Sequence, residues 1–216
     1  MTRYRPAPPR TLLIGCGALA QEMVSLKRAH GWSQMELSCL PADLHNRPAK
    51  IPEAVRGKIQ AAKGQYDHIL VLYGDCGTGG KLDAVLEEEG VVRIQGAHCY
   101  EFYAGATDFA ALTEREPGTF FLTDYLVRHF DRLIIKGLGL DRFPQLLGDY
   151  FGNYRRLVYL AQVDDTALDL EAKAAALRLG LAYERRFTGL QGLARFLGSD
   201  SPEEENVGEA HDRLLA

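Results

Sequence analysis

Short aliphatic runs alternate with helical patterns along most of this chain. Residues 11–14 and 68–73 are typical of strands, and each run is followed by a glycine-rich turn and a segment whose apolar residues have helical spacing. This alternation is typical of βαβ units, in which the strands run parallel and the helices cover the sheet. We therefore predict the α/β class, with repeated βαβ units and mainly parallel sheets.

The same patterns predict most of the individual elements. Residues 120–137 fit either a strand followed by a helix or one long helix, and the pattern does not decide between them. The predicted strands are 11–14, 35–38, 68–73, 91–94, 157–162 and 183–187. The predicted helices are 18–30, 51–62, 81–89, 144–150, 166–180 and 190–197.

A chain of 216 residues is long enough for one large domain or two small ones. We predict one α/β domain between a proline-rich flexible leader and a polar mobile tail, built from two cysteine-bearing repeats and one cysteine-free region. The predicted parts are the leader 1–10, the domain 11–198 with its repeats 11–62 and 68–116 and its cysteine-free region 117–198, and the tail 199–216.

The composition is that of an ordinary globular protein, with 46% hydrophobic and 25% charged residues. The net charge of −4 and the lack of a basic stripe argue against non-specific nucleic-acid binding. No apolar run approaches the ~18 residues of a membrane span. We expect a small-molecule ligand, and neither nucleic acid nor a membrane, as the partner.

The four cysteines are Cys16, Cys39, Cys76 and Cys99, and all lie in the first half of the chain. The first ten residues lack the apolar core of a secretory signal, so we expect a cytoplasmic, reducing location. Structural disulfides are not expected in such a compartment, and metal binding or catalysis becomes the better interpretation of the thiols.

The cysteine spacing suggests an internal repeat. Both Cys16 to Cys39 and Cys76 to Cys99 span 23 residues, and the two pairs are offset by 60. A gene duplication explains this spacing, and two ordinary βαβ units of similar length explain it as well. In either case we expect the cysteines at the carboxyl ends of parallel strands, where open α/β sheets bind their ligands.

Four thiolates at one edge of a sheet suit a four-iron four-sulfur cluster, with zinc as the alternative. The predicted metal ligands are Cys16, Cys39, Cys76, Cys99 and His45, with Gly17 and Gly77 also in contact with the cofactor. No C-x-x-C is present, so neither a zinc ribbon nor a ferredoxin loop is indicated. A redox-active thiol pair without metal, or four inert buried thiols, remain the alternatives.

Several acidic and histidine residues adjoin the cysteines. Asp75 precedes Cys76, His98 precedes Cys99, and Glu101 follows two residues later. We predict that Asp75, His98 and Glu101 serve as catalytic acids or bases beside a bound small molecule. The glycine-rich residues 74–80 also suggest a phosphate loop, but the order of residues departs from the Walker pattern, so a nucleotide site is the weaker interpretation.

The cysteine motifs also carry a family resemblance. The chain resembles the family catalogued as domain of unknown function 1638 over residues 10–198. The motifs are Gly15-Cys16-Gly17, Leu44-His45-Asn46, Gly74-Asp75-Cys76-Gly77, His98-Cys99-Tyr100-Glu101-Phe102 and the segment 117–123. Members of that family often accompany corrinoid-dependent methyltransferases, so the resemblance implies a role in one-carbon metabolism of methylated amines.

Three functions remain open at this point. The first is a metal- or cluster-dependent enzyme acting on a small molecule in corrinoid-linked metabolism. The second is a non-catalytic metal or cluster carrier, or an accessory factor that docks a protein of a corrinoid methyltransferase system. The third is a thiol-redox regulator. We favour the enzyme, because the acids and histidines beside the cysteines exceed what a simple metal clamp requires.

Overall fold

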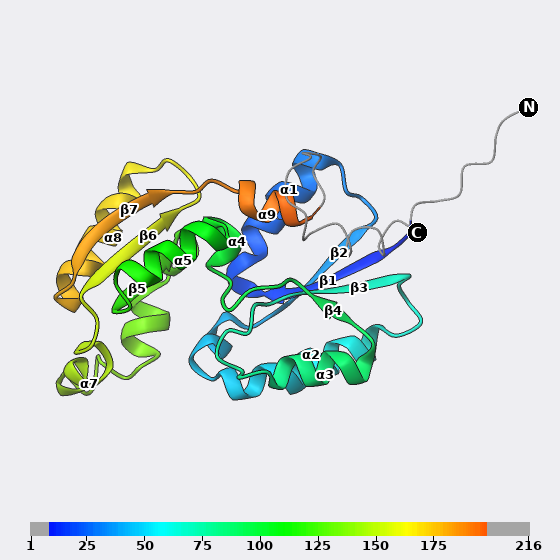
Figure 1. The fold of residues 1–216 in the computed structure, drawn as a ribbon, viewed down its shortest axis with the longest axis horizontal. Coiled ribbons are helices and arrows are strands. Elements are labelled where there is room, and N and C mark those ends of the chain that lie inside the picture. The colour runs from blue at the N-terminus through cyan, green and yellow to red at the C-terminus, as the bar shows by residue number, and fades with distance from the viewer. Residues whose placement is uncertain (1–8, 198–216) are drawn as a thin grey trace, which may run out of the picture. The chain divides into compact units, whose positions relative to one another are not determined.

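The computed structural model describes residues 9–197, so most of the predicted leader and the whole predicted tail lie outside the described part. The described residues fall into two compact units, which divide between Gln95 and Gly96 (Figure 1). Each unit has its own sheet, and every strand pair in both sheets is parallel. The predicted α/β class with mainly parallel sheets is confirmed.

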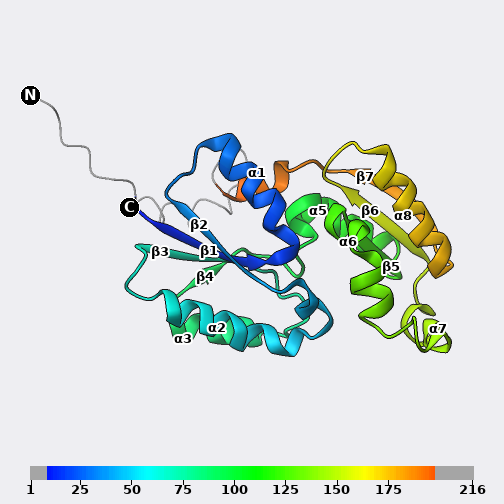
Figure 2. The same cartoon turned by 180° about the vertical axis from the view of Figure 1, so that it is seen from behind.

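The first unit contains a four-stranded sheet with the order β2-β1-β3-β4. Its central strand β1 is buried along its whole length, as expected for a strand with neighbours on both sides and helices on both faces. Helix α1 lies on one face, and α2 and α3 lie on the other (Figures 1 and 2). The elements are β1 Thr11–Cys16, η1 Gly17–Leu19, α1 Ala20–His30, β2 Met35–Leu40, η2 Ala42–Asn46, η3 Pro48–Lys50, α2 Ile51–Ala62, β3 His68–Leu72, α3 Lys81–Glu89 and β4 Val92–Arg93.

The second unit contains a three-stranded sheet with the order β5-β6-β7. The segment 120–137, which the sequence left open, forms a strand followed by a short α-helix and a π-helical turn. The elements are α4 Glu101–Ala104, α5 Ala106–Arg115, β5 Thr119–Thr123, α6 Asp124–Arg128, η4 Asp131–Lys136, η5 Pro144–Leu146, α7 Leu147–Phe151, β6 Arg156–Ala161, α8 Thr166–Leu179, β7 Ala182–Phe187 and α9 Gln191–Phe196.

The division between the units differs from the predicted break after residue 116. Strand β4 has only two residues, so the first sheet holds the chain weakly beyond Arg93. Tyr100 and Leu112 then join the apolar core around β6. The segment 96–115, which the sequence assigned to the second repeat, therefore belongs to the second unit.

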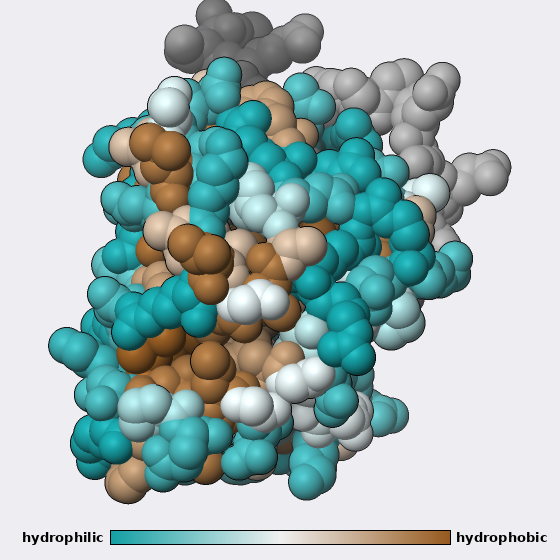
Figure 3. Space-filling model, turned by 90° about the vertical axis from the view of Figure 1, so that its left-hand side faces the viewer, coloured by the Kyte–Doolittle hydropathy of each residue, from teal (hydrophilic) through white to brown (hydrophobic). Residues whose placement is uncertain are grey.

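The core of the second unit is built on β6, all of whose residues are buried. Alanines of α8, including Ala172 and Ala176, are small enough to bring that helix close to the sheet. The same unit exposes large apolar side chains, and Figure 3 shows apolar patches among polar side chains on one face of the molecule. Its exposed large apolar residues are Phe143, Tyr150, Val163, Leu170, Leu177 and Phe187.

Within residues 9–197, no helix is both long enough and apolar enough to cross a membrane.

Candidate thiol site

Cys16 is the last residue of β1, at the carboxyl edge of the first sheet. Its sulfur accepts a hydrogen bond from the backbone N–H of Ala18 at 3.5 Å, which starts the turn into the first helical segment. Burial raises the pKa of this thiol to about 11, and the nearby thiols of Cys76 and Cys39 add to the increase. The hydrogen bond from the Ala18 N–H lowers the pKa by a smaller amount. Cys16 is therefore a neutral thiol near pH 7.

Cys39 lies in the neighbouring strand β2, but it faces the other way. Gly15 pairs with Cys39 and Cys16 pairs with Leu40 in the parallel register. Because successive side chains of a strand point to opposite faces, Cys16 and Cys39 are directed to opposite faces of the sheet. Burial raises the pKa of the Cys39 thiol, and Lys58 of α2 opposes that increase, in agreement with a position on the α2 side.

Cys76 lies in the loop after β3, four residues beyond the end of that strand. It is the only non-glycine residue with a positive φ in the described part of the chain, at 49°. Residues with a Cβ adopt this left-handed region at a cost, so the surrounding loop must hold Cys76 there. The thiol of Cys16 interacts electrostatically with Cys76, as it does with Cys39.

Asp75 holds this loop together. Its carboxylate accepts hydrogen bonds from the Thr78 hydroxyl at 2.7 Å, the Gly80 N–H at 2.9 Å and the Gly79 N–H at 3.1 Å. These bonds, with that of Gly80 first, lower the pKa of Asp75 to about 2. Asp75 was predicted to be a catalytic acid or base, and in this setting it is a fixed carboxylate that carries no proton near pH 7.

The same bonds explain why the glycine-rich loop is not arranged as a phosphate cradle. A phosphate loop presents its backbone N–H groups to the ligand. Here the N–H groups of Gly79 and Gly80 point to the Asp75 carboxylate, which occupies the place of an external anion. The nucleotide interpretation therefore gains no support from the geometry.

The two glycines predicted to contact a cofactor have clear structural roles. A Cβ on Gly17 would lie 3.0 Å from the backbone oxygen of Leu40, so only glycine lets the ends of β1 and β2 come this close. Gly77 has φ +82°, and a Cβ there would meet the ring of Pro48. Both positions bring backbone segments together beside the cysteines.

His45, predicted as an additional ligand, lies in the short helix η2 and is exposed. This helix follows β2 at the carboxyl edge of the first sheet. The structure thus keeps His45 in the same unit as Cys16 and Cys76.

Cys99, His98 and Glu101 belong to the second unit. Strand β4 ends at Arg93, six residues before Cys99, so Cys99, like Cys76, lies in the loop after a strand. Glu101 accepts hydrogen bonds from the N–H groups of Ala97 at 2.6 Å and His98 at 3.2 Å. The His98 ring stacks on Tyr100 at a centroid distance of 4.0 Å. In this setting Glu101 closes the turn that leads into α4.

These placements test whether the cysteines fit a cluster. Among residues 9–197, no group of three or more His, Cys, Asp and Glu side chains is arranged to hold a metal ion. Within the first unit, Cys16 and Cys39 point to opposite faces of the sheet. Cys99 lies in the second unit. In the first unit, Cys16 ends β1, and Cys76 lies in the loop after the adjacent strand β3.

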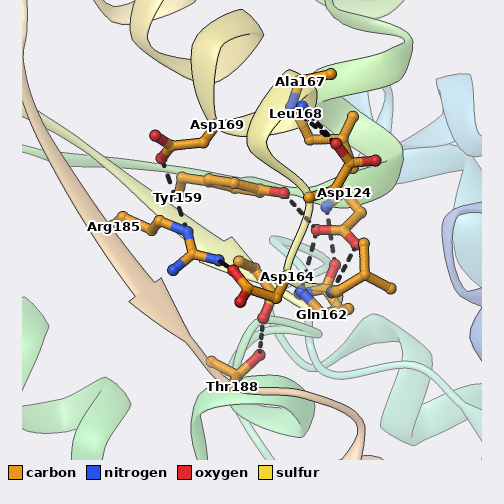
Figure 4. A network of polar contacts seen from close by, with 12 residues as sticks. Asp124, Tyr159, Gln162, Asp164, Ala167, Leu168, Asp169, Arg185 and Thr188 are labelled. Atoms are coloured by element: carbon orange, nitrogen blue, oxygen red, sulfur yellow. Dashed lines mark hydrogen bonds and ion pairs between the residues drawn. The ribbon is translucent and has the colours of Figure 1, made fainter.

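Sequence reasoning missed a buried polar site at the carboxyl edge of the second sheet. Asp124, 1% exposed, follows β5 directly, and its carboxylate accepts hydrogen bonds from the Tyr159 hydroxyl at 2.7 Å and from the N–H groups of Gln162 and Val163, each at 3.0 Å. Figure 4 shows these groups converging on the Asp124 carboxylate. Burial and the bond to Asp124 raise the pKa of Tyr159.

The arrangement around Asp124 ties the end of β5 to the end of β6. The Asp124 N–H also donates to the Gln162 side chain at 2.8 Å, so the two residues bind each other in both directions. The only sequence signal was an aspartate directly after a strand, preceded by Thr123, whose hydroxyl caps α6. All of these partners are internal, which makes Asp124 a structural residue.

One family matches the chain. The family described as "Protein of unknown function (DUF1638)" matches residues 39–197, about three-quarters of the sequence. This chain belongs to the DUF1638 family. The matched region of this DUF1638 protein contains Cys39, Cys76 and Cys99, whereas β1 and Cys16 lie before it. The comparison with curated proteins and the comparison with solved structures give no match.

Proposed function

We propose that this DUF1638 protein holds a soft metal ion through the thiolates of Cys16 and Cys76, and that a small molecule is bound and converted beside it. The observation that carries the proposal is that Cys16 ends β1 and Cys76 lies in the loop after the adjacent parallel strand β3, with Cys76 kept in a strained backbone conformation. Strain of this kind is maintained at functional sites when the surrounding structure supports it.

The chemistry of the two donors supports a cation between them. Burial and the neighbouring thiols keep Cys16 protonated in the free protein. A soft divalent ion reverses this preference, because it binds thiolates and displaces their protons. When bound, such an ion supplies Lewis-acid chemistry or activates a thiolate. The chain's own contribution is to hold two sulfurs on rigid strand ends, with the Asp75 network fixing the loop that bears Cys76.

The site needs further ligands beyond this pair. His45 is a candidate within the first unit, and Cys99 is the remaining thiol of the predicted set. An iron–sulfur cluster requires such additional thiolates. A single metal ion bound by thiolates and histidine needs fewer of them and is therefore the simpler occupant. The corrinoid-linked role rests on the family resemblance alone, and the metal proposal does not depend on it.

A thiol-redox pair is the second candidate, and one observation favours it. Hydrogen bonds to Asp83 hold Arg93 near the loop and raise its pKa, and the charges of Asp75 and Cys76 add to the increase. Arg93 therefore interacts electrostatically with Cys76, whereas burial keeps Cys16 protonated. This asymmetry suits a nucleophilic and a resolving cysteine, which would form a disulfide when an oxidant accepts their two electrons.

Cobalt titration of the full-length protein, purified without oxygen, tests the two candidates. Thiolate-bound Co²⁺ gives a near-ultraviolet charge-transfer band. We expect the band in the wild type, its loss in Cys16→Ser and Cys76→Ser, and its retention in Cys39→Ser, the matched control on the opposite face. A band that depends equally on Cys39, or no band at all, contradicts the metal proposal. A Cys16–Cys76 disulfide in oxidised metal-free protein, found by peptide mapping, selects the redox pair.

A further inference from the structure

The second unit contains a cavity of about 300 Å³ beside α5 and the ends of β6 and β7. Its apolar lining comes from Leu112 and Leu160, with Ala104 and Ala111 beside them. Its rim is charged, with Asp108 and Arg115 of α5 and Arg186 of β7. Small-molecule sites combine apolar lining with placed polar groups, and this volume lies at the small end of their range of about 300–1,000 Å³.

The register of the second sheet explains why these residues meet. Leu160 of β6 pairs with Arg186 of β7, so both side chains point to the same face. Glu184 lies two residues before Arg186 and shares that face, whereas Arg185 points to the other face and binds Asp164. The cavity opens on the face of Leu160, where the small side chains of neighbouring helical residues leave space between helix and sheet.

The charges on this face are unequal. Glu184 receives three guanidinium groups, from Arg115, Arg156 and Arg186. Arg156 is 8% exposed, and its remaining donors are used on the Thr119 hydroxyl at 2.8 Å and the Leu112 carbonyl at 2.6 Å. One carboxylate cannot neutralise three guanidinium groups, so positive charge is left at this end of the cavity.

Arg115 and Arg186 have donors to spare. Each is about half exposed at the side chain, and each contacts Glu184 through a single nitrogen. A guanidinium carries five N–H donors in a planar fork that matches a carboxylate. Asp108 on the same rim repels anions of high charge. The rim therefore suits one singly charged acidic group.

We propose that this cavity binds a small organic monoanion, a carboxylic acid with a short apolar body. The carboxylate faces Arg115 and Arg186, and the body lies on Leu112, Leu160 and Ala111. The site lies within the second unit and uses none of the cysteines, so this proposal and the thiol proposal stand or fall separately.

Titration of ¹⁵N-labelled protein with hexanoate tests the proposal by NMR. We expect saturable shifts concentrated at the amides of Leu112, Leu160 and Thr188. Hexanol and hexylamine, which share the body, and acetate, which shares the headgroup, should bind about tenfold more weakly, because each lacks one half of the contacts. Equal binding of hexanol contradicts recognition of the anion, and shifts spread over the whole surface contradict a single site.

Three variants complete the test. Arg186→Gln removes one exposed charge and should weaken hexanoate binding about tenfold, as expected for one charge-assisted contact. Ala111→Leu fills the cavity from an exposed position of α5 and should abolish the localised shifts. Arg178→Gln is the control, since Arg178 is also half exposed but pairs with Asp131 away from the cavity. Unchanged binding in both Arg186→Gln and Ala111→Leu would overturn the proposal.

Discussion

The strain at Cys76 predicts an unusual order of stabilities among its variants. Cys76 has φ 49°, where a residue with a Cβ pays roughly 1–2 kcal/mol relative to the right-handed region. Glycine avoids this cost but loses about 0.5–1 kcal/mol through its greater freedom in the unfolded chain. Cys76→Ala removes the sulfur and keeps the strain. We therefore expect Cys76→Gly to be more stable than Cys76→Ala by about 0.5–1 kcal/mol.

Urea unfolding followed by tryptophan fluorescence measures this difference. Trp32 is the only tryptophan, and it lies in the first unit with Cys76. Gly90→Ala calibrates the experiment, because Gly90 has φ +67° in the same unit with no atom near its added Cβ, and the variant should lose about 1 kcal/mol. If Cys76→Gly is less stable than Cys76→Ala while Gly90→Ala behaves as expected, the strain argument is refuted.

Other predictions follow from the buried groups. The pKa of Cys16 rises from 9.0 to about 11, so its alkylation at pH 8 should be about 100-fold slower in the folded than in the unfolded protein. Mass spectrometry of the alkylated protein measures this rate. Since the folded form keeps that proton longer, the free energy of unfolding should fall by about 2 kcal/mol between pH 9 and 11, and Cys16→Ser should lack this fall. Asp124→Ala leaves the Tyr159 hydroxyl and two N–H groups without an acceptor, so it should lower the free energy of unfolding in urea by about 3 kcal/mol. Asp149→Ala, at an exposed site, should leave that free energy almost unchanged. The pKa of Asp75 falls from 3.8 to about 2 on folding, so the stability that its carboxylate contributes should be lost as the pH falls from about 4 to 2. If Asp75→Asn loses the same free energy of unfolding over this pH range, Asp75 does not stabilise the loop in this way.

The sequence predicted the strands and helices of the first unit well, because strong local signals bound them. The predicted helices 51–62 and 81–89 have the same bounds as α2 and α3. Gly90, with a left-handed backbone, ends α3 where glycine is favoured. Signals of this kind lie within a few residues, so one sequence is enough to find them.

The helices α4 and α5 were missed for the opposite reason. They follow Tyr100, and their apolar residues Phe109 and Leu112 pack against the second sheet instead of continuing the repeat. The cysteine spacing suggested a second repeat extending to residue 116, but β4 is too short to anchor it. Membership of a unit depends on long-range packing, which spacing alone does not report.

The candidate site shows the same limit. The sequence placed Cys16 at the end of a strand correctly, yet it could not assign the faces of Cys16 and Cys39, since a shift of one residue in register reverses them. It also could not show how the Asp75 carboxylate is held, because the bonds from the backbone N–H groups of Gly79 and Gly80 form only in the folded loop.

Metal analysis of protein purified without oxygen tests the central claim most directly. The measurement is the metal and inorganic sulfide content per chain of the wild type, Cys16→Ser, Cys76→Ser and Cys39→Ser. The account predicts bound metal in the wild type and in Cys39→Ser, and its loss in the other two variants. Equal metal content in all four proteins, or a wild type that retains no metal while all its thiols titrate, would contradict a metal site at Cys16 and Cys76.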